Sequence, residues 1–272
     1  MLATFVLLAV LLSVRARTPV HAAFAAIAIG LAANVKESGA ALLLPFVVLF
    51  LVRGRPRWCL TAIFAPVTFT LVSMTGLALG GEHAGPLDAW RTATRIVLEH
   101  ATTTSFSHPM TSHWYTWLVQ RRPIPLDFVV SAPGTVRTMN SIGNLLLWWS
   151  ASVVFVLTPF PVLVTGLRAP ARAWLPGALS PTATLFTAAL SLMLPWMLGR
   201  VDSYVYHYLP SYTLLLVALG GLVARVERRA PTSALAFVGG VAVVSAFYAP
   251  VWTGAELSAA AYTARLFVPG WR

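Results

Sequence analysis

The sequence contains few charged residues and almost no cysteine. Only 10% of its 272 residues are charged while 58% are hydrophobic, and the mean hydropathy is +0.76. Soluble domains carry about a quarter charged residues, so this composition argues against a soluble domain. The single cysteine, Cys59, excludes an internal disulfide and a thiolate metal site. We also expect no cleavable signal peptide, because no basic leader precedes the first apolar stretch.

Apolar runs recur from end to end, and several approach the roughly 20 residues that cross a bilayer. They lie near residues 1–14, 19–35, 38–52, 58–80, 143–166, 179–198, 204–224 and 233–252. The pattern predicts an all-α integral membrane protein with about eight transmembrane helices. We expect four membrane segments in residues 1–80, a long loop at 81–142, and a four-helix domain with a short tail at 143–272.

The formal net charge of +11 comes from arginines grouped in alternate connections. Basic short loops mark the cytoplasmic side. We therefore predict a multi-pass protein of the cell (inner or plasma) membrane, with both termini and the 81–142 loop outside. Grouping between apolar runs also argues against a nucleic-acid partner. The groups are Arg15 and Arg17; Arg53, Arg55 and Arg57; Arg168 and Arg172; and Arg225, Arg228 and Arg229.

The long loop contains an amphipathic stretch, LDAWRTATRIVLEHATT. At helical spacing its apolar and charged side chains separate onto opposite faces, which predicts a helix lying in the membrane interface. The apolar face has Leu87, Trp90, Val97, Leu98 and Ala101, and the polar face has Asp88, Arg91, Arg95 and Glu99.

Three polar or aromatic stretches lie on the predicted outer side. In AANVKESGA, Lys36 and Glu37 form an ionisable pair near membrane depth, which indicates function by default. A short outer hairpin with a self-neutralising pair explains the same residues. In LPWMLGRVDSYVYHYLP, Arg200 and Asp202 occupy an outer turn, and His207 follows Tyr206 at the start of a span. His207 suits either a phosphate or hydroxyl contact or a satisfied core histidine.

The third stretch, FSHPMTSHWYTWLVQRRPI, is the richest in aromatic and cationic residues. Rings beside guanidinium groups suit a sugar next to a phosphate, because arginine binds phosphate bidentately. By composition alone, an interfacial anchor of Trp, Tyr and Arg is the favoured interpretation. The spacing of His108 and His113 does not predict a metal site. The residues concerned are His108, His113, Trp114, Tyr115, Trp117, Arg121 and Arg122.

Taken in order, these motifs resemble the protein O-mannosyltransferase family, of the GT-C class of membrane glycosyltransferases, over nearly the whole chain. Leu145 and Leu118 stand where the family usually has proline. The resemblance is carried by Lys36, Ser38 and Gly39; His108, Pro109, Ser112, Trp114, Trp117, Arg122 and Pro123; Gly143, Asn144, Trp148 and Trp149; Leu194, Pro195, Trp196, Arg200, Tyr206, His207, Tyr208 and Pro210; and the terminal Trp271.

The resemblance implies an inverting, metal-independent transfer of mannose from a polyprenyl-phosphate donor to Ser or Thr of exported proteins. The donor is a substrate, so no cofactor is expected; the partners are the bilayer, the lipid-linked sugar and the acceptor protein. By resemblance, the fold is a GT-C bundle of which this chain is the carboxy-terminal two thirds. Residues expected to bind the donor phosphate and sugar are Lys36, His108, Trp114, Trp117, Arg122, Arg200, Tyr206 and His207.

The general base is not assigned to this chain, because the family carries an Asp-Glu pair in an earlier outer loop. We expect a missing amino-terminal half to supply it, and the chain alone to be inactive. Glu37, Asp127 and Asp202 are the candidates within the chain because they face outward. Three alternatives stay open: a non-catalytic scaffold or partner subunit of the same fold, a lipid-linked-sugar transporter, and a related enzyme using another sugar or acceptor.

Overall fold

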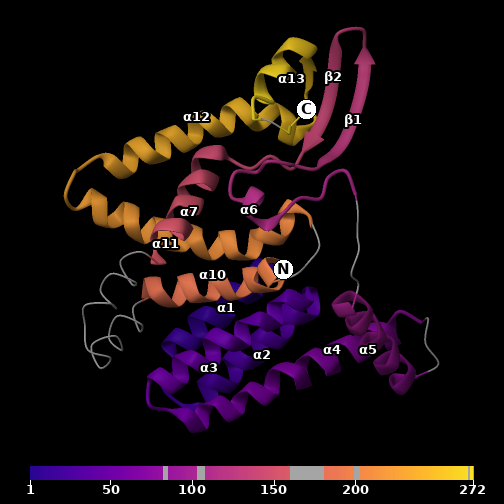
Figure 1. Cartoon of the computed structure of the whole chain (residues 1–272), viewed down its shortest axis with the longest axis vertical. Helices are drawn as coiled ribbons and strands as arrows, with labels where there is room; N and C mark the ends of the chain where they lie inside the picture. The colour runs from indigo at the N-terminus through magenta and orange to yellow at the C-terminus, as the bar shows by residue number, and fades with distance from the viewer. Residues whose placement is uncertain (82–84, 103–107, 160–180, 199–202, 269, 272) are drawn as a thin grey trace. The chain divides into compact units, whose positions relative to one another are not determined.

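The computed structural model describes residues 1–81, 85–102, 108–159, 181–198, 203–268 and 270–271. Within these ranges the chain is mostly helical and forms two compact units (Figure 1). The first unit comprises Met1–Ser105 and Thr158–Arg200, and the second comprises Phe106–Leu157 and Val201–Arg272. Each unit therefore combines segments that are distant in sequence.

The first unit is built around a helix rich in alanine. Its elements are α1 (Leu2–Arg15), α2 (Pro19–Val35), η1 (Glu37–Leu42), α3 (Leu43–Val52), η2 (Pro56–Ile63), α4 (Phe64–Leu79), α5 (Pro86–Thr102) and α10 (Pro181–Leu198). Most of the buried residues of α2 are alanines. At Gly30 the backbone of α4 comes so close that a Cβ would collide with the Ala65 carbonyl. Small residues thus allow these two helices to approach closely.

Arginines join two connections of the first unit at one end. The Arg53 guanidinium donates to the carbonyls of Ser13 and Val14 at 2.9 and 2.8 Å. It therefore caps the carboxy-terminal end of α1, whose last carbonyls have no partner within the helix. The connection after α1 and the connection after α3 thus lie together, as the predicted topology requires. Which side of the membrane they face stays a prediction.

Residues 86–102, where an amphipathic helix was predicted, form α5. Ala89 is fully buried, whereas Leu87, Trp90 and Leu98 are exposed. On the polar face, Arg95 lies 3.7 Å from Glu99. The interfacial position of α5 stays a prediction.

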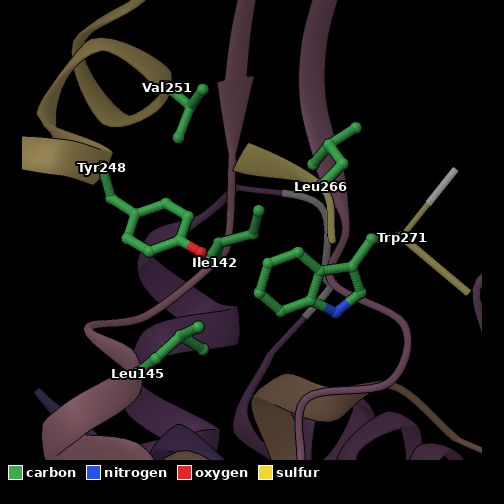
Figure 2. Close-up of a cluster of buried hydrophobic side chains, with 6 residues drawn as sticks. All are labelled: Ile142, Leu145, Tyr248, Val251, Leu266 and Trp271. Carbon is green, nitrogen blue, oxygen red and sulfur yellow. The ribbon is translucent and has the colours of Figure 1, made fainter. Parts of the chain in front are cut away.

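The second unit joins helices to a small sheet. Its elements are α6 (Trp114–Trp117), β1 (Pro125–Ala132), β2 (Thr135–Asn140), α7 (Leu145–Leu157), η3 (Val205–Tyr208), α11 (Leu209–Glu227), α12 (Ser233–Thr253), β3 (Glu256–Ser258) and α13 (Ala259–Arg265). Its core lies where α7 begins and α12 ends. Figure 2 shows Tyr248 and Val251 of α12 around Ile142 and Leu145, with Leu266 and Trp271 closing the cluster.

The all-α prediction is wrong for residues 125–140 and 256–258. β1 and β2 form an antiparallel hairpin, and β3 pairs with β2, giving the order β1-β2-β3. The turn contains Gly134, whose φ of +78° is in the left-handed region that favours glycine. Valine and threonine, which are β-branched, occur on both sides of this turn and favour strands.

Within the described residues, each of the eight apolar runs predicted from the sequence overlaps a helical segment of the structure. Three of the helices are long and apolar enough to cross a membrane: Pro56–Leu79, Val205–Glu227 and Ser233–Thr253. The other apolar helices are shorter within the described residues. The chain therefore has several candidate spans, but the structure does not establish about eight complete crossings.

Candidate functional site

A turn at residues 108–112 begins the candidate site in the second unit. The His108 carbonyl accepts a hydrogen bond from the Thr111 hydroxyl at 2.7 Å. The His108 Nδ1 atom accepts one from the Met110 amide at 3.2 Å. Because Nδ1 is the acceptor, a neutral imidazole carries its proton on Nε2. The turn therefore selects the tautomer of His108.

A backbone bridge joins this turn to the segment before η3. The Ser112 and Ser203 amides donate to each other's carbonyls at 2.9 and 3.1 Å. Beside the bridge, the His108 ring lies 5.6 Å from the ring of Tyr204, which stacks on Tyr206 at 5.3 Å. Two distant segments thus meet at one aromatic surface.

Arg122 is held against the same turn. Its Nη1 donates to the Pro109 carbonyl at 3.1 Å and to the Thr111 carbonyl at 2.8 Å. The side chain is exposed, and the donors on Nε and Nη2 make no hydrogen bond to the described residues, so they can bond an anion. Ser112 Oγ is buried and has no hydrogen-bond partner among the described residues. A buried polar atom of this kind is a natural contact for a ligand or water.

Trp117 and His207 line the buried side of this surface. Their rings lie 6.1 Å apart, and the His207 ring lies 4.4 Å from Tyr206. The Trp117 carbonyl accepts a hydrogen bond from Trp148 Nε1 of α7 at 2.8 Å, which fixes the loop against the helix. The structure thus brings several of the predicted residues into one region, and these are His108, Trp117, Arg122, Tyr206 and His207.

Trp114 lies at the first residue of α6, in the same loop. Its ring packs edge-on against Tyr115 at 5.9 Å, and Tyr115 stacks on His113 at 5.3 Å. Tyr115 is exposed, so this second group of rings presents an apolar face to the surroundings.

Gln120 organises the loop, and the sequence interpretation did not identify it. Its φ is 54°, which is uncommon for a residue other than glycine. The buried side chain accepts a hydrogen bond from the Gly143 amide at 3.1 Å through Oε1, and the backbone carbonyl of Gln120 accepts one from the Trp271 indole. A Cβ on Gly143 would come within 2.6 Å of Gln120 Nε2. No sequence motif marks Gln120, although Gly143 and Trp271 were both noted.

Lys36 lies in the first unit, between α2 and η1. Its Nζ lies 5.9 Å from the centre of the Trp196 ring, an arrangement that favours a cation–π interaction. Burial lowers the pKa of the Lys36 amino group, and the negative charge of Glu37 opposes that shift. The structure gives Lys36 a defined setting but does not place it relative to the site in the second unit.

Other predicted residues are described less fully. Arg200 and Asp202 lie outside the described residues. Glu37 is exposed in the first turn of η1, and Asp127 is exposed on β1. Glu37 belongs to the first unit and Asp127 to the second, and the described residues do not identify a base.

Residues 88–271 match the family model described as the C-terminal four TMM region of protein-O-mannosyltransferase. This match covers more than half of the chain and includes the whole 108–123 loop and η3. Neither the curated proteins nor the solved structures gave a match.

Proposed function

This chain belongs to the protein O-mannosyltransferase family, and from that premise we propose that it helps transfer mannose from a polyprenyl-phosphate donor to Ser or Thr of exported proteins. It is a multi-pass membrane protein, as a lipid-linked donor requires. Within it, we assign recognition of the donor phosphate to the region around Arg122.

The observation that carries the assignment is the setting of Arg122. Two backbone carbonyls hold Nη1, so the guanidinium is oriented before any ligand arrives. Pre-organised donors lose less conformational entropy on binding than mobile ones. Nε and Nη2 can bond a phosphate bidentately. Ser112 Oγ belongs to the same turn and would supply a further contact.

The aromatic residues beside the turn suit the sugar. Tyr204 and Tyr206 are stacked, and Tyr206 is 43% exposed, so a ring face is accessible. The buried Trp117 and His207 support these rings from behind. A mannosyl group could therefore lie against the rings while its phosphate contacts Arg122.

In the proposed reaction, an acceptor hydroxyl oxygen attacks the anomeric carbon of mannose. The bond from that carbon to the phosphate oxygen breaks, and the hydroxyl proton passes to a base. The products are a mannosylated protein and polyprenyl phosphate. Arg122 would stabilise the negative charge that develops on the leaving phosphate, which is the contribution expected of a fixed cation. We do not assign the base to a residue of this chain.

Binding of polyprenyl phosphate and transfer of labelled mannose, measured on the purified chain in proteoliposomes, test the proposal separately. We expect Arg122→Gln to weaken binding of polyprenyl phosphate by about 10- to 100-fold, because a hydrogen bond to a charged group contributes about 1.5–3 kcal/mol. Arg122→Lys should recover part of the binding, since lysine keeps the charge but loses the planar fork.

Arg121→Gln is the matched control, because it removes the same charge from the neighbouring exposed position. If Arg121→Gln and Arg122→Gln weaken binding equally, non-specific attraction explains the result and the assigned site is wrong. A segment with an Asp-Glu pair can be added to supply the missing base. If the chain then binds polyprenyl phosphate but still transfers no mannose, a scaffold is favoured over an enzyme.

A further inference from the structure

β1 exposes an unusual amount of apolar surface for a strand in a sheet. All of its residues are exposed, and Leu126, Phe128 and Val130 have 68%, 52% and 64% of their surface accessible. β1 is also an outer strand, since the sheet order is β1-β2-β3. An exposed apolar edge strand is a liability in water, so native proteins usually cover or charge it.

On one face of this sheet, the side chains of β2 are buried while those of β1 are exposed. Phe128 pairs with Thr138 and Val130 pairs with Val136, and paired residues of antiparallel strands point to the same side. On β2 these partners are buried, whereas on β1 the side chains are exposed. The Phe128 ring lies 5.9 Å from Tyr262 of α13, which places α13 on this face. The exposed β1 side chains and α13 therefore lie on the same face of the sheet.

α13 lies beside the last turns of a candidate membrane helix. Arg265 Nε donates to the Phe247 carbonyl of α12 at 2.7 Å, and its guanidinium lies 4.8 Å from the Phe247 ring. The Tyr248 hydroxyl donates to the Arg265 carbonyl at 3.3 Å. Phe247 precedes the end of α12 at Thr253 by six residues, or about 9 Å at the rise of an α-helix. The end of α13 thus lies at the depth of the last turns of α12.

Side-chain contacts connect the exposed apolar residues of α12 to the hairpin through α13. α12 exposes Leu235, Val238, Val243 and Phe247, as expected of a helix surrounded by lipid. From Phe247 these contacts pass over Arg265 and Tyr262 of α13 to Phe128. Aromatic rings with an arginine at the end of a membrane helix are typical of the bilayer interface. Figure 1 shows the hairpin and α13 together at this end of α12.

We propose that the apolar side chains of β1, together with α13, form a membrane-interface anchor. Phe128 and Val130 enter the boundary between lipid headgroups and acyl chains, and Arg265 holds α13 against α12 through its bond to the Phe247 carbonyl. The occupant of this face is the bilayer that contains α12, not a protein partner. The anchor fixes the hairpin, and with it the 108–123 loop that leads into β1, relative to the membrane surface.

Spin labelling of the full chain in vesicles of phosphatidylcholine and phosphatidylglycerol tests this proposal. Cys59→Ser removes the native thiol, after which a single cysteine is placed at Phe128, at Val130 or at Asp127. Asp127 is the matched control, because it is exposed on the same strand but pairs with Met139 on the opposite face. We expect labels at Phe128 and Val130 to show a several-fold higher ratio of oxygen to nickel-chelate collisions than the label at Asp127.

The alternative occupants give different spectra. A water-exposed face would give high nickel-chelate collision rates at all three positions, which would overturn the proposal. A face covered by protein, such as an acceptor polypeptide added to the edge of β1, would give immobilised labels shielded from both reagents and would also overturn it. Neither result would affect the phosphate assignment to Arg122.

Discussion

At the residue scale, Lys36 is partly buried beside Trp196. It is the only lysine in the chain, so its side chain can be modified selectively. We predict that an amine-reactive reagent acylates Lys36 with a pH midpoint below that of a free lysine, since burial disfavours the charged amine. Glu37→Gln removes the charge that raises the pKa, so the midpoint should fall further. Peptide mapping by mass spectrometry separates Lys36 from the terminal amine.

A midpoint equal to that of free lysine would contradict the buried setting. Trp196→Leu is a useful second variant, because it removes the cation–π contact but leaves Glu37 in place. The contact favours the charged amine, so its loss should also lower the midpoint.

The sequence was informative about single residues with strong chemical character. The residue types and neighbours of His108, Arg122 and His207 predict their place in the site. Their segments meet through the backbone bridge between Ser112 and Ser203 and through ring contacts such as that of His108 with Tyr204. Gln120 was not selected, because its importance comes from a left-handed backbone and a long-range hydrogen bond to Gly143. Neither feature leaves a signal in residue type.

At the scale of elements, Asn144 connects two helices. Its Oδ1 accepts from the Leu147 amide at the start of α7, while its Nδ2 donates to Val241 and Ser245 of α12 at 2.8 and 2.9 Å. The first bond is a helix cap, and the other two join helices. Hydrogen bonds of the second kind are a common means of holding membrane helices together.

We predict that Asn144→Asp lowers the thermal unfolding temperature in detergent, although aspartate caps a helix as well as asparagine does. The reason is that aspartate cannot donate to α12 and places an acceptor opposite the Val241 carbonyl. Asn144→Ala should cost a further contribution for the cap, about 0.5–2 kcal/mol.

Thr18→Asp serves as the control, because Thr18 caps α2 through bonds within its own helix. This variant should leave the unfolding temperature nearly unchanged. Equal effects of Asp at both positions would show that the bonds between α7 and α12 contribute little.

Helix positions were predictable because a long apolar run is a local signal that needs no knowledge of distant residues. The strands were missed because β1 and β2 lie in a loop without strict alternation, and β1 has a register shift between Pro125 and Asp127. β3 is a short strand of three residues whose identity depends on pairing with β2. Such non-local pairing cannot be read from a local pattern.

At the scale of the whole molecule, the arginines in alternate connections predict which connections face the cytoplasm and which face outward. In a Cys59→Ser background in intact cells, we predict that a cysteine at Ser131 is modified by an impermeant thiol reagent, whereas one at Ala230 is modified only after permeabilisation. The arginines beside Ala230 retain their connection on the cytoplasmic side. Both positions are exposed, so burial does not confuse the comparison.

Labelling of Ala230→Cys in intact cells would reverse the predicted orientation. Labelling of both positions would indicate that one of the intervening apolar segments does not cross the membrane. The second outcome bears directly on the shorter helices, such as α7 with 13 residues.

The bonds of Gln120 also have a consequence for the order of synthesis. Gln120 and Trp271 are 151 residues apart in the chain, yet the Trp271 indole holds the Gln120 carbonyl. The ribosome therefore synthesises the 108–123 loop long before it synthesises Trp271, whose indole holds that loop in place. Long-range contacts of this kind form slowly and late. The region around Arg122 should thus mature only after α11 and α12 have been inserted, so a nascent chain would not carry a finished site while it is still entering the membrane.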